Sequence, residues 1–217
     1  MKWNRLSLIF GCAIIVIFIL FAALPSVFAP YGAKEMFSPW LFPCIQHPLG
    51  TNDMGYDILS ELIYASRSTI IIGVTAALVS LMIGSGIGIL AGYLPGWRGE
   101  LAGSVIQIFL LIPMLPMAIV ISAFLGDSTV NIILIIAVLG WCGTARTVRT
   151  RTMQLKQTPF VESLMILGLP RGHIMLRHIL PNLWEIILSR YIMSVAQCIM
   201  LEASLSFLGM GDPTQVT

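Results

Sequence analysis

The chain has 217 residues, of which 57% are hydrophobic and only 10% are charged. A soluble domain usually carries about 25% charged residues, so the composition excludes a soluble globular protein and indicates a helical protein that crosses a membrane several times. The net charge of +2 does not suggest a nucleic-acid partner. The four cysteines are scattered, which implies neither a disulfide framework nor a CxxC metal site.

The first apolar run, Leu6–Leu24, follows Lys2 and Arg5 and is 19 residues long. The apolar core of a signal peptide has about 7–15 residues, so we expect a retained first transmembrane helix within residues 1–28. A signal peptide cleaved after Ala29 is the alternative.

Residues 29–67 are interrupted by four prolines and several glycines, a composition typical of a loop. Near its end, Ile58, Leu62 and Ala65 share one face of a possible helix, so we predict a short amphipathic helix over Asp57–Ala65. We interpret the whole region as extracytoplasmic. His47 has no second histidine at a useful spacing, so we do not expect a metal site there.

The second predicted span, Ser68–Tyr93, carries a small residue at every fourth position, namely Ser80, Gly84, Gly88 and Gly92. Such a ridge lets the backbone of another transmembrane helix approach closely. The GSGIG run within it could be taken for a phosphate loop. It lies in an apolar helix without lysine, so we predict helix packing.

The third predicted span, Leu101–Leu125, has Pro113 and Pro116 in its middle. Proline removes backbone hydrogen bonds and kinks a helix. The kink would lie either beside a transport path or at a bend needed for packing.

A fourth span is predicted from Val130 to about Arg146, and it continues as a basic helix towards Lys156. A short helix follows, because Thr158 can cap it, Pro159 suits its first position, and Gly168 ends it. About ten residues give roughly 15 Å, too short to cross a hydrocarbon core of about 30 Å. This short apolar helix must therefore dock in a groove, either on its own bundle or on a partner.

The fifth predicted span runs from Leu180 to about Leu201 and contains Glu185 and Arg190, with Glu202 at its far end. Charged residues inside spans are costly and often functional. Arg190 would line the translocation path or pair with a partner subunit. We interpret Glu185 as an interfacial carboxylate and Glu202 as part of a gate or a subunit contact.

The basic residues predict the orientation of the spans. With the N-terminus in the cytoplasm, the inner segments hold nine lysines and arginines, and the outer segments hold only Lys34 and Arg67. The positive-inside rule therefore favours a cytoplasmic N-terminus and places the short helix in the cytoplasm.

Three motifs carry a resemblance to a known family. The spacing of Glu162, Gly168 and Leu180–Pro181 resembles the EAA loop of ABC-importer permease subunits. HPLGTNDMGYD at His47–Asp57 and EASLSFLGMG at Glu202–Gly211 are similar to signatures of the dipeptide, oligopeptide and nickel branch. The resemblance runs from about His47 to Gly211, most of the chain, and the three motifs stand in the expected order.

The resemblance implies an all-α, polytopic membrane protein of the type I ABC-importer permease kind. Five spans are visible, and a sixth is expected beyond the C-terminal end of this sequence. The chain would divide into an N-terminal transmembrane helix (1–28), an extracytoplasmic loop with a short amphipathic helix (29–67) and a permease core (68–217). The cytoplasmic coupling loop occupies residues 146–181 of that core.

The resemblance also implies function and partners. The chain would form half of a translocation path for peptides, nickel or related small solutes in the inner membrane. The implied partners are two ATP-binding subunits, a second and different permease subunit, and an extracytoplasmic solute-binding protein. The residues expected to couple to the ATP-binding subunits are Phe160, Val161, Glu162, Leu164, Met165 and Gly168. The candidates for the path or its gate are Pro113, Pro116, Arg190 and Glu202.

Catalytic motifs are missing from the sequence. There is no GxxxxGK[ST], HExxH or GxSxG pattern, so we expect a non-catalytic subunit without its own cofactor or metal, with ATP and Mg bound on the partner subunits. An ion-coupled secondary transporter is the alternative. It predicts matching broken helices in two halves of the chain, and only the third span is broken by proline.

Overall fold

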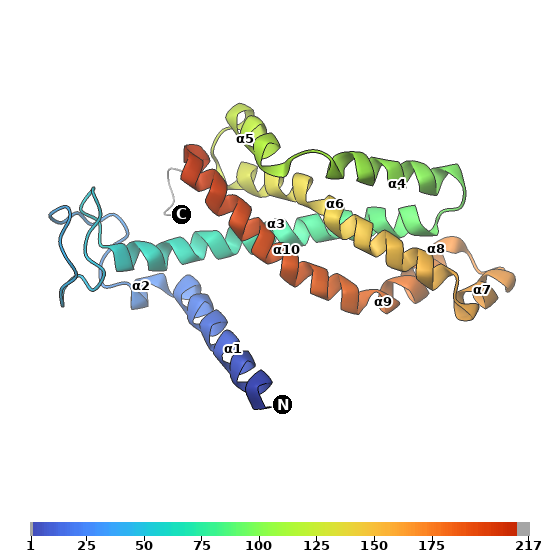
Figure 1. Ribbon diagram of the computed structural model, residues 1–217, viewed down its shortest axis with the longest axis horizontal. Coiled ribbons are helices and arrows are strands. Elements are labelled where there is room, and N and C mark those ends of the chain that lie inside the picture. The colour runs from blue at the N-terminus through green and yellow to red at the C-terminus, as the bar shows by residue number, and fades with distance from the viewer. Residues whose placement is uncertain (1, 212–217) are drawn as a thin grey trace. The chain divides into compact units, whose positions relative to one another are not determined.

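The computed structural model describes residues 2–211, with side chains from Ser7 onward, and shows an all-helical chain (Figure 1). The helices are α1 (Lys2–Ala23), α2 (Pro25–Phe28), α3 (Ile58–Tyr93), α4 (Trp97–Leu110), α5 (Met114–Leu125), α6 (Thr129–Lys156), α7 (Pro159–Ile166), α8 (Arg171–Ile174), α9 (Leu180–Asn182) and α10 (Trp184–Leu205). Two π-helical turns complete the set, η1 (Met175–Ile179) and η2 (Ser206–Met210). The described residues contain no β-strand, only two isolated bridges.

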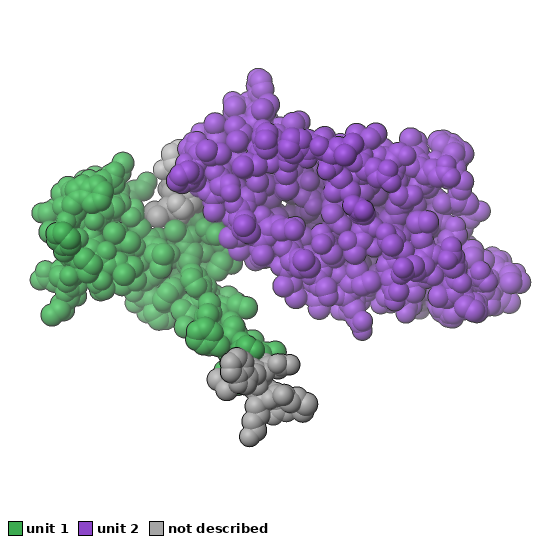
Figure 2. All heavy atoms as spheres, viewed as in Figure 1, with its two compact units in different colours: residues 1–72, 211–217 green, residues 73–210 purple. Residues whose placement is uncertain are grey.

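The chain forms two compact units, coloured separately in Figure 2. Unit 1 comprises residues 1–72 with 211–217, and unit 2 comprises residues 73–210. Helix α3 begins in unit 1 and continues into unit 2 without interruption.

Within the described residues, three helical segments are long and apolar enough to cross a membrane alone. They are α3, α6 and the segment Trp184–Met210, while α4 and α5 together make a fourth, broken span. The Ser7–Ala23 part of α1 is a shorter apolar helix. All 22 residues of α1 give about 33 Å at 1.5 Å per residue, which matches the thickness of a hydrocarbon core.

Helix α3 corrects the prediction of a separate amphipathic helix before the second span. Residues Ile58–Tyr93 form one helix of 36 residues. Neither glycine nor proline stands between Ile58 and Ser68, and the Ser66 hydroxyl donates to the Ile63 carbonyl one turn back. The sequence therefore offers no local reason to end the helix, and the predicted break near Ser68 is wrong.

The third predicted span is not one kinked helix but two helices bent by 84°. Helix α4 ends at Leu110, and Pro113 caps α5 in extended conformation. Pro116 lies in the first turn of α5, where backbone N–H groups have no helical partner anyway, so its missing donor costs little. The two prolines thus start a new helix rather than bend an old one.

The small-residue ridge of α3 packs directly on the backbone of α6, as the sequence predicted. A Cβ atom built on Gly84 would lie 2.6 Å from the Trp141 carbonyl oxygen. On Gly88 it would lie 2.7 Å from the Ala145 carbonyl, and on Gly92 2.7 Å from the Arg149 carbonyl. Helix α6 also packs against α4, α5 and α10, so it lies at the centre of unit 2.

The helical segment before the fifth span starts earlier than predicted. Helical residues begin at Arg171 instead of Leu180 and pass through η1 and α9 into α10. The wide turn η1 precedes Pro181, which has no N–H to bond the carbonyl one turn back. The loop proline therefore alters the helix without ending it.

The loop of unit 1 is held by buried polar contacts around Asp57. One carboxylate oxygen lies 2.9 Å from His47 Nδ1, and the other accepts from the Ser60 backbone N–H and hydroxyl at 2.9 and 2.8 Å. Burial would raise the pKa of Asp57, but the bonds from His47 and Ser60 outweigh it and lower the pKa below its ordinary value. The His47 ring packs against both Tyr31 and Phe37, which also pack against each other. The HPLGTND stretch is therefore a built scaffold rather than a loose turn.

Candidate functional site

Helix α7 is the predicted coupling helix, and its ends follow from its sequence. Pro159 occupies the first helical position, and Thr158 precedes it in extended conformation. The Thr158 hydroxyl does not cap the helix; it donates to the Leu155 carbonyl at 2.6 Å. At the other end Gly168 has φ = 77°, and the N–H groups of Gly168 and Leu169 bond the carbonyls of Met165 and Leu164. This is a Schellman motif, which glycine favours because the position is left-handed.

Two of the predicted coupling residues face the protein's own core. Val161 is only 2% exposed, and Leu164 packs beside it. The buried residues of this cluster are Ile89, Tyr93, Val148, Val161, Ile174, Ile179, Leu183 and Ile187. They come from α3, α6, α7, α8, η1 and α10, and Leu183 directly precedes α10. Val161 and Leu164 therefore fasten α7 to the bundle and do not offer a surface to a partner.

The other residues of α7 and the residue that follows it are mostly exposed, and most of them are apolar. Phe160, Met165 and Glu162, three of the expected coupling residues, are exposed, and Ile166 and Leu167 are 85% and 74% exposed. The sequence prediction omitted Ile166 and Leu167. The signal was present, because two large apolar residues directly before a stop glycine cannot both turn inward when Val161 and Leu164 already define the inner face.

One contact of α7 and one contact just before it hold this end of unit 2 together. The Phe160 ring packs edge-on against His178 with centroids 5.6 Å apart. Lys156, the last residue of α6, donates to the Tyr93 carbonyl at 2.9 Å and lies over the Tyr93 ring. Figure 1 shows α7 and α8 at the same end of unit 2 as the turn between α3 and α4.

A cavity of about 350 Å³ lies beside α7 at this end. Its lining includes the α3–α4 turn, the last turns of α6, and Glu162 and Met165 of α7. Glu100, Arg149 and Lys156 also border it. The exposed face of α7 is thus continuous with a polar hollow that includes both acidic and basic groups.

A second cavity, of about 240 Å³, lies where the broken span turns from α4 to α5. Ile112 and Met114 border it on either side of Pro113, and Arg190, Ser194 and Gln197 of α10 face it. The Arg190 Nε atom is buried, and no hydrogen-bond partner for it exists among the described residues. Broken helices are tolerated in membranes where they line a cavity. The sequence candidate Arg190 therefore lies beside the break of the third span, and the neighbours of Pro113 on both sides line the same cavity.

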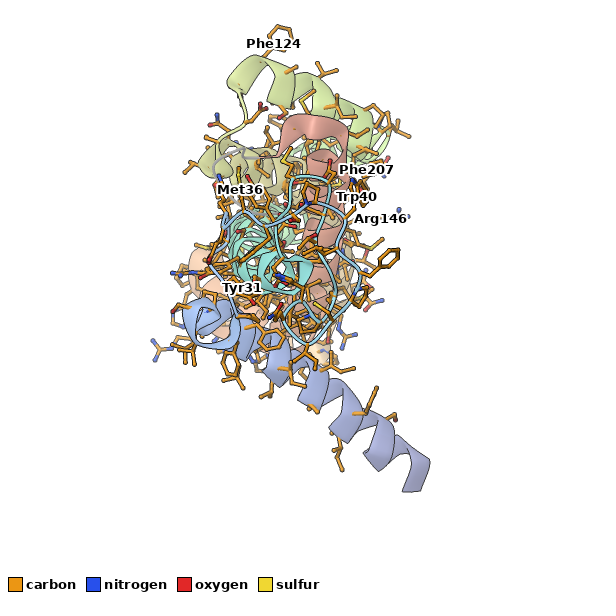
Figure 3. All side chains as sticks on the ribbon, turned by 90° about the vertical axis from the view of Figure 1, so that its left-hand side faces the viewer. Tyr31, Met36, Trp40, Phe124, Arg146 and Phe207 are labelled. Carbon is orange, nitrogen blue, oxygen red and sulfur yellow. The ribbon has the colours of Figure 1, made fainter. Side chains whose placement is uncertain are left out.

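The other sequence candidates, Pro113, Pro116 and Glu202, are not among the residues that line this cavity. Glu202 is buried at 1% exposure and accepts a hydrogen bond from the Ser206 hydroxyl at 2.9 Å. At the far end of the broken span, Phe124 extends away from the helices and is strongly exposed (Figure 3). No group of three or more side chains that could hold a metal ion lies in the described part of the chain.

Residues 84–217 match the model of a protein family described as the binding-protein-dependent transport system inner membrane component. The chain belongs to this family. The matched residues include α7 and all the residues that line the cavity of Arg190. The family match confirms the all-α polytopic architecture predicted from the sequence.

Curated relatives extend the similarity over most of this permease chain. It is 33% identical to the glutathione transport system permease protein GsiD of Pectobacterium atrosepticum, with 84% of this chain and 62% of the relative covered. It is 32% identical to the oligopeptide transport system permease protein OppC of Bacillus subtilis, over 97% of this chain and 69% of the relative. It is 31% identical to the dipeptide transport system permease protein DppC of Alkalihalophilus pseudofirmus, over 97% of this chain and 70% of the relative. The chain thus spans 62% to 70% of the length of these relatives.

Proposed function

We propose that this chain is a permease subunit of an ABC importer for small peptides in the prokaryotic inner membrane. Family membership carries this proposal, and the relatives named for glutathione, oligopeptide and dipeptide transport support the class of solute. None of these three is named for nickel. The comparisons give no support to an ion-coupled transporter.

The proposed partners follow from the kind of importer. A second, different permease subunit completes the translocation path, and an extracytoplasmic solute-binding protein delivers the peptide. Two ATP-binding subunits hold ATP and Mg and supply the energy. This chain is non-catalytic, and its contribution is the path and the mechanical link.

The exposed face of α7 is the proposed docking surface for an ATP-binding subunit. Phe160, Met165, Ile166 and Leu167 present apolar side chains, and Glu162 adds a charge. An exposed apolar helix face fits a groove of a partner. Closure of the ATP-binding subunits would push on α7, and Val161 would pass the displacement to the core cluster shared with α3, α6 and α10.

Co-purification tests this coupling. Wild type, Glu162→Ala and Ile166→Asp are compared for retention of candidate ATP-binding subunits in detergent. Leu176→Asp is the matched control, because Leu176 is an exposed apolar residue of η1 outside α7. We expect Ile166→Asp to lose the ATP-binding subunit and Leu176→Asp to keep it. Equal retention by wild type and Ile166→Asp would contradict the docking surface.

A further inference from the structure

A third cavity, of about 510 Å³, lies between α4 and α6 and is basic. Its lining consists of Gly103, Ile106, Gln107, Leu110 and Leu111 from α4 and its C-terminal end, and of Arg146, Arg149, Thr150 and Met153 from α6. Gly103 has no side chain, and the Arg149 guanidinium packs directly against it. Two arginines and one amide thus share a hollow whose remaining walls are mostly apolar.

The positive charge of this cavity is not neutralised within the described chain. None of its lining residues is acidic, and neither arginine forms an ion pair with any described carboxylate. The Arg149 Nε atom is buried, and the described residues offer it no hydrogen-bond partner. Glu100 and Glu162 border the neighbouring cavity, which Arg149 also lines, yet neither pairs with it. A partly buried guanidinium without a counter-ion is costly, so the cavity favours an anionic group from outside this chain.

The basic cavity adjoins the cavity of Arg190. Leu110 borders both, and on α6 the Arg190 cavity is lined by Gly143, one turn before Arg146. From Gly143 to Met153 the helix rises about 15 Å at 1.5 Å per residue. Arg190, Arg146 and Arg149 therefore follow one another along one side of α6, and Arg146 is exposed at the surface of unit 2 (Figure 3).

We propose that the cavity between α4 and α6 is an anion-binding subsite of the translocation path and takes the carboxylate of the transported peptide. The proposal rests on the function proposed above. Guanidinium groups bind carboxylates through paired, charge-assisted hydrogen bonds, and the Gln107 amide adds a neutral donor. The row of three arginines over two adjoining cavities favours a solute that passes from one to the next. The phosphate of a lipid headgroup, which basic pockets at the cytoplasmic side also bind, is the competing occupant.

Transport of two peptides that differ only in the carboxylate tests the subsite. The complete importer is reconstituted in phosphatidylcholine vesicles, and uptake of trialanine is compared with uptake of trialaninamide. The binding protein is the same in every experiment, so a change in the acid-to-amide ratio of kcat/KM between variants reports the permease alone. The variants are Arg146→Gln and Arg149→Gln, with Arg149→Lys to retain the charge. Arg98→Gln on α4 is the control, since Arg98 is exposed and lines none of the three cavities described.

The loss of a charge-assisted hydrogen bond corresponds to about ten- to a hundredfold in affinity. We therefore expect the acid-to-amide ratio to fall about tenfold or more in the two Gln variants, to recover partly in Arg149→Lys, and to stay unchanged in Arg98→Gln. Arg146 is exposed, so Arg146→Gln keeps the test valid even if Arg149→Gln does not fold. An unchanged acid-to-amide ratio in the Gln variants, including an equal fall in kcat/KM for both peptides, would overturn the subsite.

Two further observations separate the alternatives. If wild type transports neither peptide and retains no ATP-binding subunit, the proposed function fails rather than the subsite. The lipid alternative is tested by adding phosphatidylglycerol to the vesicles. If the Gln variants lose only the response to phosphatidylglycerol and keep the wild-type acid-to-amide ratio, the cavity binds a lipid phosphate and the proposal is overturned.

Discussion

Replacing Gly88 with valine tests whether the contact between α3 and α6 depends on the small-residue ridge. A Cβ atom at this position would lie 2.7 Å from the Ala145 carbonyl oxygen and 2.8 Å from Val148 Cβ. Comfortable separations are about 3.5–4.0 Å, so the helices would have to separate by about 1 Å. Overpacking typically costs about 1–3 kcal/mol, and valine brings three carbons into the contact. Valine gains only a few tenths of a kcal/mol over glycine in helix propensity. We expect a loss of about 2–3 kcal/mol.

The matched control is Gly86→Val, since no atom lies within 4 Å of a Cβ built on Gly86. Both variants are unfolded by heat in the same detergent, and the midpoints are compared with wild type. Gly88→Val should unfold clearly earlier, whereas Gly86→Val should remain close to wild type. Adding Val148→Ala should restore part of the loss, because it removes Val148 Cγ1, which would lie 3.0 Å from the new Cβ atom. Equal midpoints for the two valine variants would refute close packing at the ridge.

Three further predictions concern unit 1 and α7. Because the pKa of Asp57 is lowered from 3.8, its carboxylate stabilises the loop above that pH, and this stabilisation is lost as the pH falls through the lower pKa of the folded state. Limited proteolysis of the loop should therefore become faster at acid pH in wild type, and Asp57→Asn should abolish this pH dependence. With the N-terminus in the cytoplasm, a membrane-impermeant maleimide should label the exposed Cys44 in intact cells and fail to label Cys44→Ser; labelling only after lysis would reverse the orientation. Val161→Ala removes two buried methyl-sized groups and should cost about 2 kcal/mol of stability. Ile166→Ala should leave the melting midpoint unchanged and weaken retention of the ATP-binding subunit. The opposite pattern would show that Ile166 faces the core and Val161 faces the partner.

Local chemistry made part of the fold predictable. Pro159 and Gly168 set the ends of α7 because their backbone preferences do not depend on the rest of the chain. The ridge from Ser80 to Gly92 predicted close packing because only small residues permit it. In each case the residue type alone restricts the structure.

Long-range packing decided what the sequence could not show. Whether Pro113 would bend a helix or begin one depends on whether the chain between α4 and α5 can turn onto α6. The error at Ser68 has a different cause, because no glycine or proline stands between Ile58 and Ser68 and the sequence is therefore compatible with one continuous helix.

The candidate site was predictable in pieces only. The depth of Arg190 in the fifth span suggested a functional charge, but its cavity is formed by residues of α4, α5 and α6 that are distant in sequence. Arg146 and Arg149 were interpreted as positive-inside anchors, which is the usual meaning of basic residues after an apolar span. Only the packing of α4 against α6, with Gly103 facing Arg149, shows that they share a cavity.

Helix α6 connects the proposed docking surface to the proposed path. It runs for 28 residues without proline, about 42 Å at 1.5 Å per residue, and its C-terminal half contributes Val148 to the core cluster that holds Val161. The same helix carries Arg146 and Arg149 on the side that faces α4. A push on α7 should therefore move α6 as a unit and change the width of the basic cavity. Spin labels at Met153 and Phe160 should keep a constant distance when ATP binds, while the distance from Met153 to a label at Leu111 should change. The reverse result would show that α7 moves without α6, and the path would then need another mechanical link.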